Sequence, residues 1–508
     1  MSCSKTNIEN LPLAIKYLDR LKRREELTQA NVHYIKKISN GTLDQAKDLL
    51  ASYLSALSEK DLTNLDETPE SKINDLLTTW GSRVDQVKKA HTEGRDIVVS
   101  SYIVGTKVNT SFLVTLERFV QSCNGILVII PQRYKNPSSL AEKYVQDDEV
   151  SFIDPLIQKY ILCDRVHLPG VTILADVRVQ PTAAKPCTGL KALSEGNSLI
   201  LGHATAQLES IPRMMPDSVK VITTTGSVSI KPPLDSLAAK KLENDMILGA
   251  VIISNRQEFH LRRIHADSKG VFYDLGRKYS QKTDTVSAPL YSTWGDIHFG
   301  QEDKDALLWA MKTCSDQGVD KIILNDSFDG QTVNPHAFTN VQRYKVFKSV
   351  TEEVNYHNEC ITQLSAFFKV YRIDSNHDDM LSRWAKTSLM SSAVSMEDVK
   401  LMYKVYTEGH RYVLEGMVIP GGTVLDSFML THGHESVNGG RPSLETYATF
   451  KNRVIGHHVH SPKEYRGQIS NGCLCQIEQD YTKGPFTGWA HAIVQVYPDH
   501  KAQLLIKP

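Results

Sequence analysis

Apolar residues recur at three-to-four spacing over the first ninety positions of the chain. The pattern covers residues 11–24, 29–38, 43–57 and 72–90. Such spacing places apolar side chains on one face of a helix, so we predict a small helical N-terminal domain over residues 1–92. Residues 40–42, Asn-Gly-Thr, separate two of these helices. Two interpretations are open, a helix-turn-helix that reads DNA and a domain that packs or oligomerises.

Short apolar runs and amphipathic helices replace this pattern after residue 95. A helix is predicted over 111–121, and strands over 97–100, 126–130, 171–174, 198–202, 219–223, 246–254 and 259–265. Uninterrupted apolar runs of strand length are typical of parallel sheets that are covered on both faces. We therefore predict a central α/β domain over residues 93–287, which ends in a polar connector around 276–287.

Strands and helices alternate again from residue 288 to residue 508. The predicted strands are 321–324, 368–373, 412–417, 424–430, 453–455, 489–497 and 503–506, and the predicted helices are 303–317 and 339–368. Alternation in the last two strands fits a half-buried sheet. The fold class is thus predicted to be multidomain α/β, with a third domain over 288–508.

Composition is that of an ordinary globular protein of about two to four domains. Among 508 residues, 41% are hydrophobic and 23% are charged, and 58 Lys and Arg balance 58 Asp and Glu. Because the formal net charge is zero, any attraction for nucleic acid must be local. No run approaches the roughly 18 uncharged apolar residues of a membrane helix, and the first residues lack the apolar region of a secretory signal. We expect a cytoplasmic protein without a membrane partner.

Two short motifs are open to more than one interpretation. Cys473 and Cys475 form the one close pair among eight scattered cysteines, which we expect to be reduced. Because no second Cys/His pair stands at zinc-finger spacing, we favour two strand residues over a metal site. Residues 223–227, Thr-Thr-Thr-Gly-Ser, follow a predicted strand but lack the glycine spacing and lysine of a phosphate loop. A plain turn is favoured there.

Metal-ligand side chains stand at the ends of the predicted C-terminal strands. Asp296 and His298 flank one residue, so they point the same way from an extended main chain. Asp326 follows strand 321–324, at the carboxyl edge where open α/β sheets place their sites. The series continues with Asn376, His377, Asp378, His432, His458 and His460. An ordered series of five such groups predicts a metal site.

This series resembles the calcineurin-like metallophosphoesterase superfamily, whose motifs are D-x-H, G-D-x-x-D, G-N-H-D, H-G and G-H-x-H. The resemblance covers residues 293–508 and implies a metallophosphoesterase α/β sandwich with two metal ions. The implied ligands of one metal are Asp296, His298, Asp326 and His460. Those of the other are Asp326, Asn376, His432 and His458, with Asp326 as the bridge.

Three family glycines are replaced in this chain. Asn325 precedes the second acidic motif, Ser375 precedes Asn376, and His457 precedes His458. The last replacement leaves the register open, since His457 could stand in for His458. His434 likewise competes with His432, which we prefer because glycine follows it.

Carboxylate, amide and imidazole ligands without thiolate favour Mn²⁺, with Fe²⁺, Zn²⁺ and Mg²⁺ as alternatives. Two such ions can clamp a phosphate and generate a bridging hydroxide as the nucleophile. The resemblance further implies that His377 stabilises the transition state or protonates the leaving alkoxide, and that Asp378 orients His377.

The superfamily includes phosphatases, cyclic nucleotide phosphodiesterases, nucleotidases and nucleases, so the ligands do not choose the substrate. Segments 97–101, 130–137, 223–227 and 258–260 resemble the middle domain of the pre-early DNases of tequintavirus-type phages. That resemblance implies a metal-dependent DNase that degrades host DNA in the bacterial cytoplasm early in infection. A phosphatase or phosphodiesterase of small nucleotides is the alternative, and a metal-free scaffold is a third interpretation.

Several side chains are candidates for DNA contacts. Tyr465 and Arg466 follow the last metal motif and are predicted to meet a strand by stacking and charge. The candidates for phosphate contacts, each also readable as an ordinary surface charge, are Arg133, Lys135, Arg262 and Arg263. The helical N-terminus predicts a homo-oligomer of unspecified size.

Overall fold

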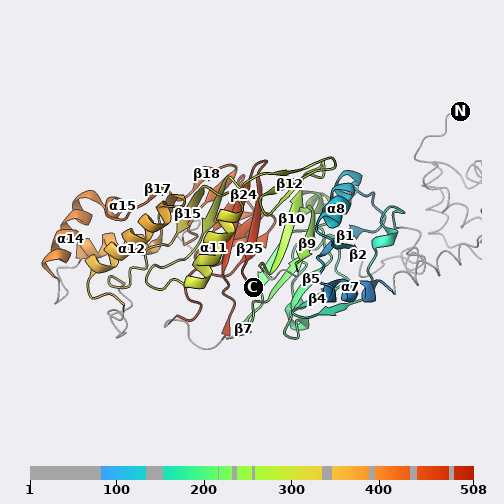
Figure 1. Cartoon of the computed structure of the whole chain (residues 1–508), viewed down its shortest axis with the longest axis horizontal. Helices are drawn as coiled ribbons and strands as arrows, with labels where there is room; N and C mark the ends of the chain where they lie inside the picture. The colour runs from blue at the N-terminus through green and yellow to red at the C-terminus, as the bar shows by residue number, and fades with distance from the viewer. Residues whose placement is uncertain are drawn as a thin grey trace, which may run out of the picture.

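The computed structural model describes residues 82–132, 153–215, 217–230, 237–254, 258–334, 346–387, 395–434, 443–479 and 486–508. The predicted N-terminal helical domain therefore lies outside the described residues up to residue 81. Its last part is α7 (Arg83–Thr92), which covers the end of the helix predicted over 72–90. Arg133 and Lys135 also lie outside them. The described part is mixed α/β and elongated, with α14 and α15 at one end and α7 and α8 at the other (Figure 1). Within it, no helix has the length and apolar character to span a membrane.

A four-stranded sheet forms the region after α7. Its order is β10 (Leu261–Ala266), β9 (Leu248–Ile253), β1 (Ile97–Ile103) and β2 (Ile126–Gln132). The helix α8 (Thr110–Ser122) joins β1 to β2 and buries Phe112, Leu116 and Phe119 against them. Only β1 and β2 are parallel, whereas β9 and β10 run antiparallel. The predicted all-parallel sheet is therefore wrong, because a strand buried on both faces is apolar throughout whichever way it runs.

The predicted connector around 276–287 is also wrong. Its residues lie in a three-stranded antiparallel sheet of β11 (Phe272–Asp274), β12 (Arg277–Tyr279) and β13 (Asp284–Val286). Strands of three residues are too short to show alternation. The last one is largely exposed, with Val286 at 78%, so it resembles a polar loop in sequence.

A ten-stranded sheet runs through the molecule and crosses residue 287. Its order is β18 (Thr423–Leu425), β19 (Phe428–Leu430), β20 (Arg453–Gly456), β22 (Gln468–Ser470), β21 (Lys463–Tyr465), β6 (Gln207–Ser210), β8 (Val221–Thr224), β5 (Ser198–Leu201), β4 (Val171–Leu174) and β3 (Val166–Leu168). The junction is an antiparallel pair, in which Glu464 faces Leu208. Segments predicted as separate domains thus share one hydrogen-bonded sheet.

A six-stranded sheet carries the remaining strands. Its order is β17 (Met417–Ile419), β16 (Lys369–Ile373), β15 (Lys321–Asn325), β14 (Tyr291–Trp294), β24 (Ala492–Tyr497) and β25 (Lys501–Ile506). The first four strands are parallel, and β24 and β25 are antiparallel. One face packs under α11 (Lys304–Asp316) and α12 (Val350–Ser365). The other shares a core with the ten-stranded sheet. Because both faces are covered, β24 is buried along its whole length and not half-buried as predicted.

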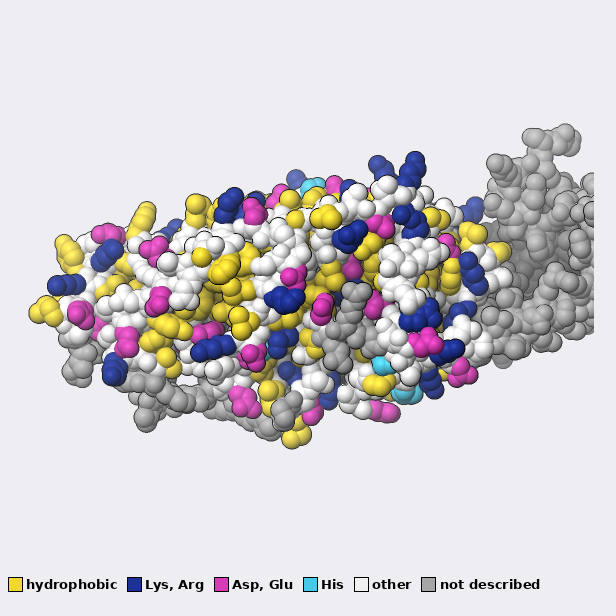
Figure 2. All heavy atoms as spheres, viewed as in Figure 1, with side chains coloured by type: hydrophobic (Ala, Val, Ile, Leu, Met, Phe, Trp, Pro, Cys, Tyr) yellow, Lys and Arg dark blue, Asp and Glu magenta, His cyan; other side chains and the backbone are white. Residues whose placement is uncertain are grey.

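Three helices pack together at one end of the described part. They are α13 (Asn376–Thr387), α14 (Met396–Glu408) and α15 (His410–Val413). Tyr412 lies in α15, so the strand predicted from 412 is shorter and begins at Met417 in β17. On the face seen in Figure 2, Lys and Arg side chains are interspersed with Asp and Glu, and no broad surface of one sign is visible there.

Candidate metal centre

Two buried carboxylates gather imidazoles at the carboxyl ends of β14 and β15. The Asp296 Oδ1 atom lies 3.2 Å from His460 Nε2. The Asp326 Oδ2 atom lies 3.7 Å from His298 Nε2, 3.6 Å from His432 Nε2 and 3.7 Å from His377 Nε2. Residues far apart in sequence therefore aim their ring nitrogens at one small volume.

The second half of the cluster comes from the ten-stranded sheet. His432 follows β19, and His458 and His460 follow its parallel neighbour β20. The main-chain N–H of His458 donates to Asp296 Oδ2 at 3.1 Å, and its Nδ1 lies 3.1 Å from His432 Nε2. The two packed sheets thus contribute ligand-type groups from opposite sides.

Five of these residues have left-handed main-chain conformations, with φ between 48° and 73°: Asp296, His298, Asp326, His458 and His460. This region is sparsely populated by non-glycine residues and carries a cost on the order of 1–3 kcal/mol each. Such strain persists where surrounding structure imposes it, and it concentrates at functional sites. The turns that follow the strands are therefore shaped around the cluster.

Asp326 and His432 have protonation states that suit metal binding, whereas burial acts to lower the pKa of His460 but Asp296 outweighs it and raises that pKa to about 10. Burial acts to raise the pKa of Asp326, but His377 and His432 outweigh it and lower that pKa to about 2. Burial lowers the pKa of His432 to about 3. The carboxylate is therefore ionised and this imidazole neutral at pH 7, as metal coordination requires.

Two buried oxygens support a fit to cations. Asp326 Oδ1 and Asn376 Oδ1 have no hydrogen-bond partner among the described residues. A buried acceptor without a partner is costly and calls for an explanation such as a bound ion. Three overlapping trios of residues hold ligand atoms within 4.8 Å of one another. They are Asp296, His298 and His460; Asp296, Asp326 and His432; and His298, Asp326 and His377. The described residues could hold metal ions.

Two of the imidazoles have a side-chain oxygen beside the ring nitrogen that faces away from the centre. His432 Nδ1 lies 2.6 Å from Asn325 Oδ1, and His298 Nδ1 lies 3.2 Å from Asp329 Oδ1. A proton on Nδ1 of His432 leaves its Nε2 with a lone pair toward the centre, whereas the contact of His298 with Asp329 lacks hydrogen-bond geometry. Sequence reasoning assigned no role to Asn325 or Asp329. The available signal was that Asn325 stands where the motif in the sequence resemblance has glycine.

His377 and Asp378 have different surroundings. His377 Nδ1 contacts the main-chain oxygen of Asp329, which leaves Nε2 facing Asp326. Asp378 is buried and pairs with Arg372 at 3.1 Å. The predicted orientation of His377 by Asp378 is therefore not seen. The reason is local, because both residues lie in the first turn of α13, where successive side chains diverge by about 100°.

The open histidine alternatives separate in space. The ring of His457 packs against Gly295, where an added Cβ would collide with His457 Nδ1. His457 belongs to no trio of potential ligands among the described residues. His460 belongs to two such trios, one with Asp296 and His298 and one with Cys473 and Cys475. The ring of His434 lies 5.1 Å from that of His432, measured between centroids. Like His457, His458 belongs to no trio among the described residues, and what sets it apart is the 3.1 Å contact of its Nδ1 with His432 Nε2.

The residues singled out for DNA contact are engaged elsewhere. Arg262 is buried against Asp274 with bonds of 2.8 and 3.1 Å, and Arg263 is buried against Glu464 at 2.5 Å. Both predictions of phosphate contact are wrong, because strand β10 carries these charges into the interior, where carboxylates neutralise them. Arg466 pairs with Asp245 at 2.5 Å and lies over the ring of Tyr465.

Tyr465 is 7% exposed and lines a pocket, so it is not an exposed stacking platform. Residues 223–227 are buried, and their hydroxyls donate mainly to main-chain oxygens. A Cβ on Gly226 would lie 2.8 Å from the Cα of Gly249. The motif is therefore a tight internal turn, as the plain interpretation predicted.

Two thiols lie behind the cluster. Cys473 and Cys475 are buried, and Cys475 Sγ lies 3.8 Å from His460 Nδ1. Each forms an isolated β-bridge, Cys473 with His491 and Cys475 with Glu302. They have the strand-like pairing that was expected, yet with His460 they also form a trio of potential ligands that sequence reasoning did not favour.

The fold and site define a mixed α/β protein with a buried carboxylate and imidazole centre that could hold metal ions. No protein-family model matches the chain. The chain is 22% identical over 489 residues to Protein A1 of Escherichia phage T5, and the match covers 87% of this chain and 85% of that protein. The similarity is distant but extends over most of both chains.

Proposed function

We propose that this protein is a metal-dependent deoxyribonuclease that hydrolyses phosphodiester bonds at the cluster around Asp296 and Asp326. The observation that carries the proposal is the convergence of three imidazole Nε2 atoms on Asp326, each within 3.7 Å. The resemblance to phage pre-early DNases supplies the substrate class. The similarity to a protein of Escherichia phage T5 supports a phage-related role, which we infer to be degradation of host DNA in the bacterial cytoplasm.

Two divalent cations fit the donor set, and Mn²⁺ is our first choice. Asp296, His298, Asp326 and His460 would hold one, while Asp326, Asn376, His432 and His458 would hold the other. Bound there, the cations would supply charge neutralisation and a hydroxide nucleophile at neutral pH.

His377 is suited to act as the general acid. Its Nδ1 is held by the main-chain oxygen of Asp329, so Nε2 remains to carry a proton toward the substrate. A proton delivered from Nε2 to the leaving 3′ or 5′ oxygen would spare that oxygen from departing as an alkoxide. Such catalysis typically contributes about 10²–10⁴-fold.

The test is incubation of the full chain with plasmid and linear DNA in Mn²⁺, beside His377→Ala and Asp326→Ala. We expect the wild type to degrade DNA, EDTA to abolish the reaction, and His377→Ala to lower kcat by about 10²–10⁴-fold. Tyr403→Phe, on the exposed surface of α14, is the matched control and should behave as wild type. Intact DNA together with hydrolysis of a mononucleotide ester would replace the nuclease with a small-nucleotide phosphodiesterase.

A further inference from the structure

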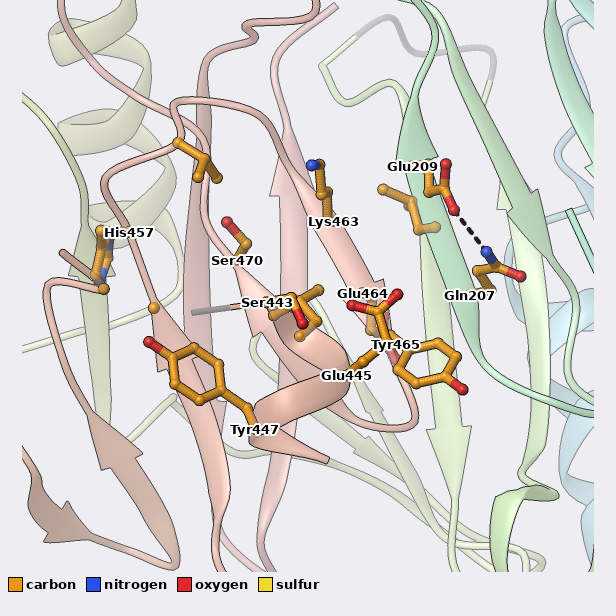
Figure 3. A pocket seen from close by; sticks show the side chains of 15 residues that line it. Gln207, Glu209, Ser443, Glu445, Tyr447, His457, Lys463, Glu464, Tyr465 and Ser470 are labelled. Atoms are coloured by element: carbon orange, nitrogen blue, oxygen red, sulfur yellow. Dashed lines mark hydrogen bonds between the residues drawn. The ribbon is translucent and has the colours of Figure 1, made fainter. Parts of the chain in front are cut away.

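A pocket of about 330 Å³ opens beside the loops that carry the candidate metal ligands (Figure 3). Its walls come from β6, β20, β21, β22 and the short helix α16 (Leu444–Tyr447). Gly433 and Val459 line it, and each is flanked along the chain by histidines of the cluster. The pocket therefore begins one residue away from those ligands.

Tyr447 presents an unsatisfied polar group in this wall. The residue is 6% exposed, and its hydroxyl has no hydrogen-bond partner among the described residues. Burial raises the pKa of Tyr447 to about 12, so the hydroxyl stays a neutral donor at pH 7. A buried hydroxyl in a pocket wall indicates that a polar ligand or water completes its hydrogen bonding.

The acidic groups of the wall are already neutralised. Glu445 pairs with Lys185 at 2.6 Å, Glu464 with Arg263 at 2.5 Å, and Glu209 with Lys191 at 2.5 Å.

Lys463 is exposed at the pocket and forms no salt bridge with the described residues. In Figure 3 it lies on the opposite side of Glu464 from Tyr447 and Tyr465. The pocket thus combines the unsatisfied hydroxyl of Tyr447 with the ammonium of Lys463, which stands opposite Glu209 in the β21–β6 pair. Its acids are paired.

We propose that this pocket binds one nucleobase of the DNA strand that the metal centre cleaves, a proposal that rests on the nuclease function above. Hydroxyls are among the groups that hold an unstacked base by hydrogen bonds to its edge, and the Tyr447 hydroxyl in the pocket wall is placed to do so. Lys463 would face the phosphate of the same nucleotide. The volume is at the lower end of the roughly 300–1,000 Å³ of small-molecule sites, which suits a nucleotide unit and excludes a duplex.

Calorimetric titration of the metal-free full chain tests the pocket separately from catalysis. The probes are dAMP, dTMP and base-free deoxyribose 5-phosphate. We expect both nucleotides to bind about 2- to 10-fold more tightly than the base-free sugar, since only they offer a base edge to the Tyr447 hydroxyl and one hydrogen bond has an effect of this size. Tyr447→Phe should weaken dAMP binding about 2- to 10-fold through loss of one hydrogen bond. Tyr403→Phe, on α14, is the control and should leave the affinity unchanged.

Cleavage kinetics give a second readout. Tyr447→Phe should raise KM for DNA by more than it lowers kcat, because the phenol binds the strand and stands apart from the metal-ligand cluster. Equal binding of dAMP and base-free sugar, or an unaltered dAMP affinity in Tyr447→Phe, would overturn the pocket proposal. If the wild type cleaves no DNA, the nuclease proposal fails, and the titration still decides whether the pocket binds a base.

Discussion

At the scale of single residues, the centre depends on side chains that hold the ligands as much as on the ligands. Asn325 stands where the superfamily that this chain resembles has glycine, and its Oδ1 lies 2.6 Å from His432 Nδ1. An acceptor at this distance fixes the proton on Nδ1 and keeps Nε2 available. Asn325 is thus positioned to select the tautomer of His432 that could bind metal.

Replacement of Asn325 by Gly should therefore weaken Mn²⁺ binding by about 10- to 100-fold, the usual effect of removing the hydrogen-bond partner of a metal-binding histidine. Calorimetric titration with Mn²⁺ measures it. Asn325→Asp, which keeps an acceptor, should retain most of the affinity. If the Gly variant binds Mn²⁺ as tightly as the wild type, His432 does not need this contact.

The candidate site could be predicted from sequence only where spacing carries the information. Asp296 and His298 share a trio of potential ligands, but the extended main chain assumed in the prediction is wrong. Both residues, and His458 and His460 too, have left-handed conformations. The partner of Asp378 was not predictable, because Arg372 reaches it through a fold-dependent turn between β16 and α13. Contacts between distant segments, such as Asn325 with His432, require the packing of two sheets.

At the scale of elements, the turn after β14 admits no side chain at Gly295. A Cβ there would collide with His457 Nδ1 and would lie 2.8 Å from the main-chain oxygen of Gly472. The glycine lets β14 end close enough to the β20 turn for Asp296 and His460 to meet.

Gly295→Ala should displace this turn, with a stability cost of about 1–3 kcal/mol from overpacking and a loss of Mn²⁺ affinity. Thermal melts and Mn²⁺ titration measure the two effects. Gly421→Ala is the matched control, since a Cβ added at Gly421 would meet no atom within 4 Å, and it should alter neither. Unaltered Mn²⁺ affinity in Gly295→Ala would show that the turn tolerates the shift.

The periodicity of the sequence predicted which segments form helices and strands better than it predicted the direction of the strands. The run 171–174 is β4 without a change of boundary, and α8 extends its predicted helix by one residue at each end. Hydrophobicity does not encode direction, so the antiparallel pairing of β9 with β1 was missed. Pairing of β21 with β6, across more than two hundred residues, likewise leaves no mark in either strand.

At the scale of the whole molecule, buried neutral histidines make folding sensitive to acid. Burial lowers the pKa of His203 to about 4 from an ordinary 6.5. Its Nε2 faces the main-chain oxygen of Gln180 at 3.0 Å, and its Nδ1 accepts from the main-chain N–H of Thr205 at 3.1 Å. Between pH 6.5 and 4 the unfolded chain takes up a proton that the folded chain excludes. The contribution of neutral His203 to the free energy of unfolding is complete above pH 6.5 and is lost as the pH falls toward 4.

His203 should account for a loss of about 3 kcal/mol across this window. Melting temperatures between pH 7.5 and 4.5 measure the effect, and His203→Gln should flatten the dependence. His167→Gln, an exposed histidine on β3, is the control and should keep the wild-type slope. A wild-type slope in His203→Gln would mean that other groups carry the acid sensitivity.

The balance of 58 basic and 58 acidic residues bears on how DNA would be held. Without a broad basic surface on the face of Figure 2, and with Arg262 and Arg263 neutralised inside the fold, the strongest local positive charge would come from bound cations. Fluorescence anisotropy of His377→Ala with labelled duplex DNA tests this. In EDTA we expect non-specific affinity, with Kd of about 10⁻⁴–10⁻⁶ M, and with Mn²⁺ at least about tenfold tighter binding, since the ions would neutralise contacted phosphates. Tight binding in EDTA that weakens steeply with salt would instead locate the DNA-binding charge outside the described residues, where the N-terminal helices are predicted.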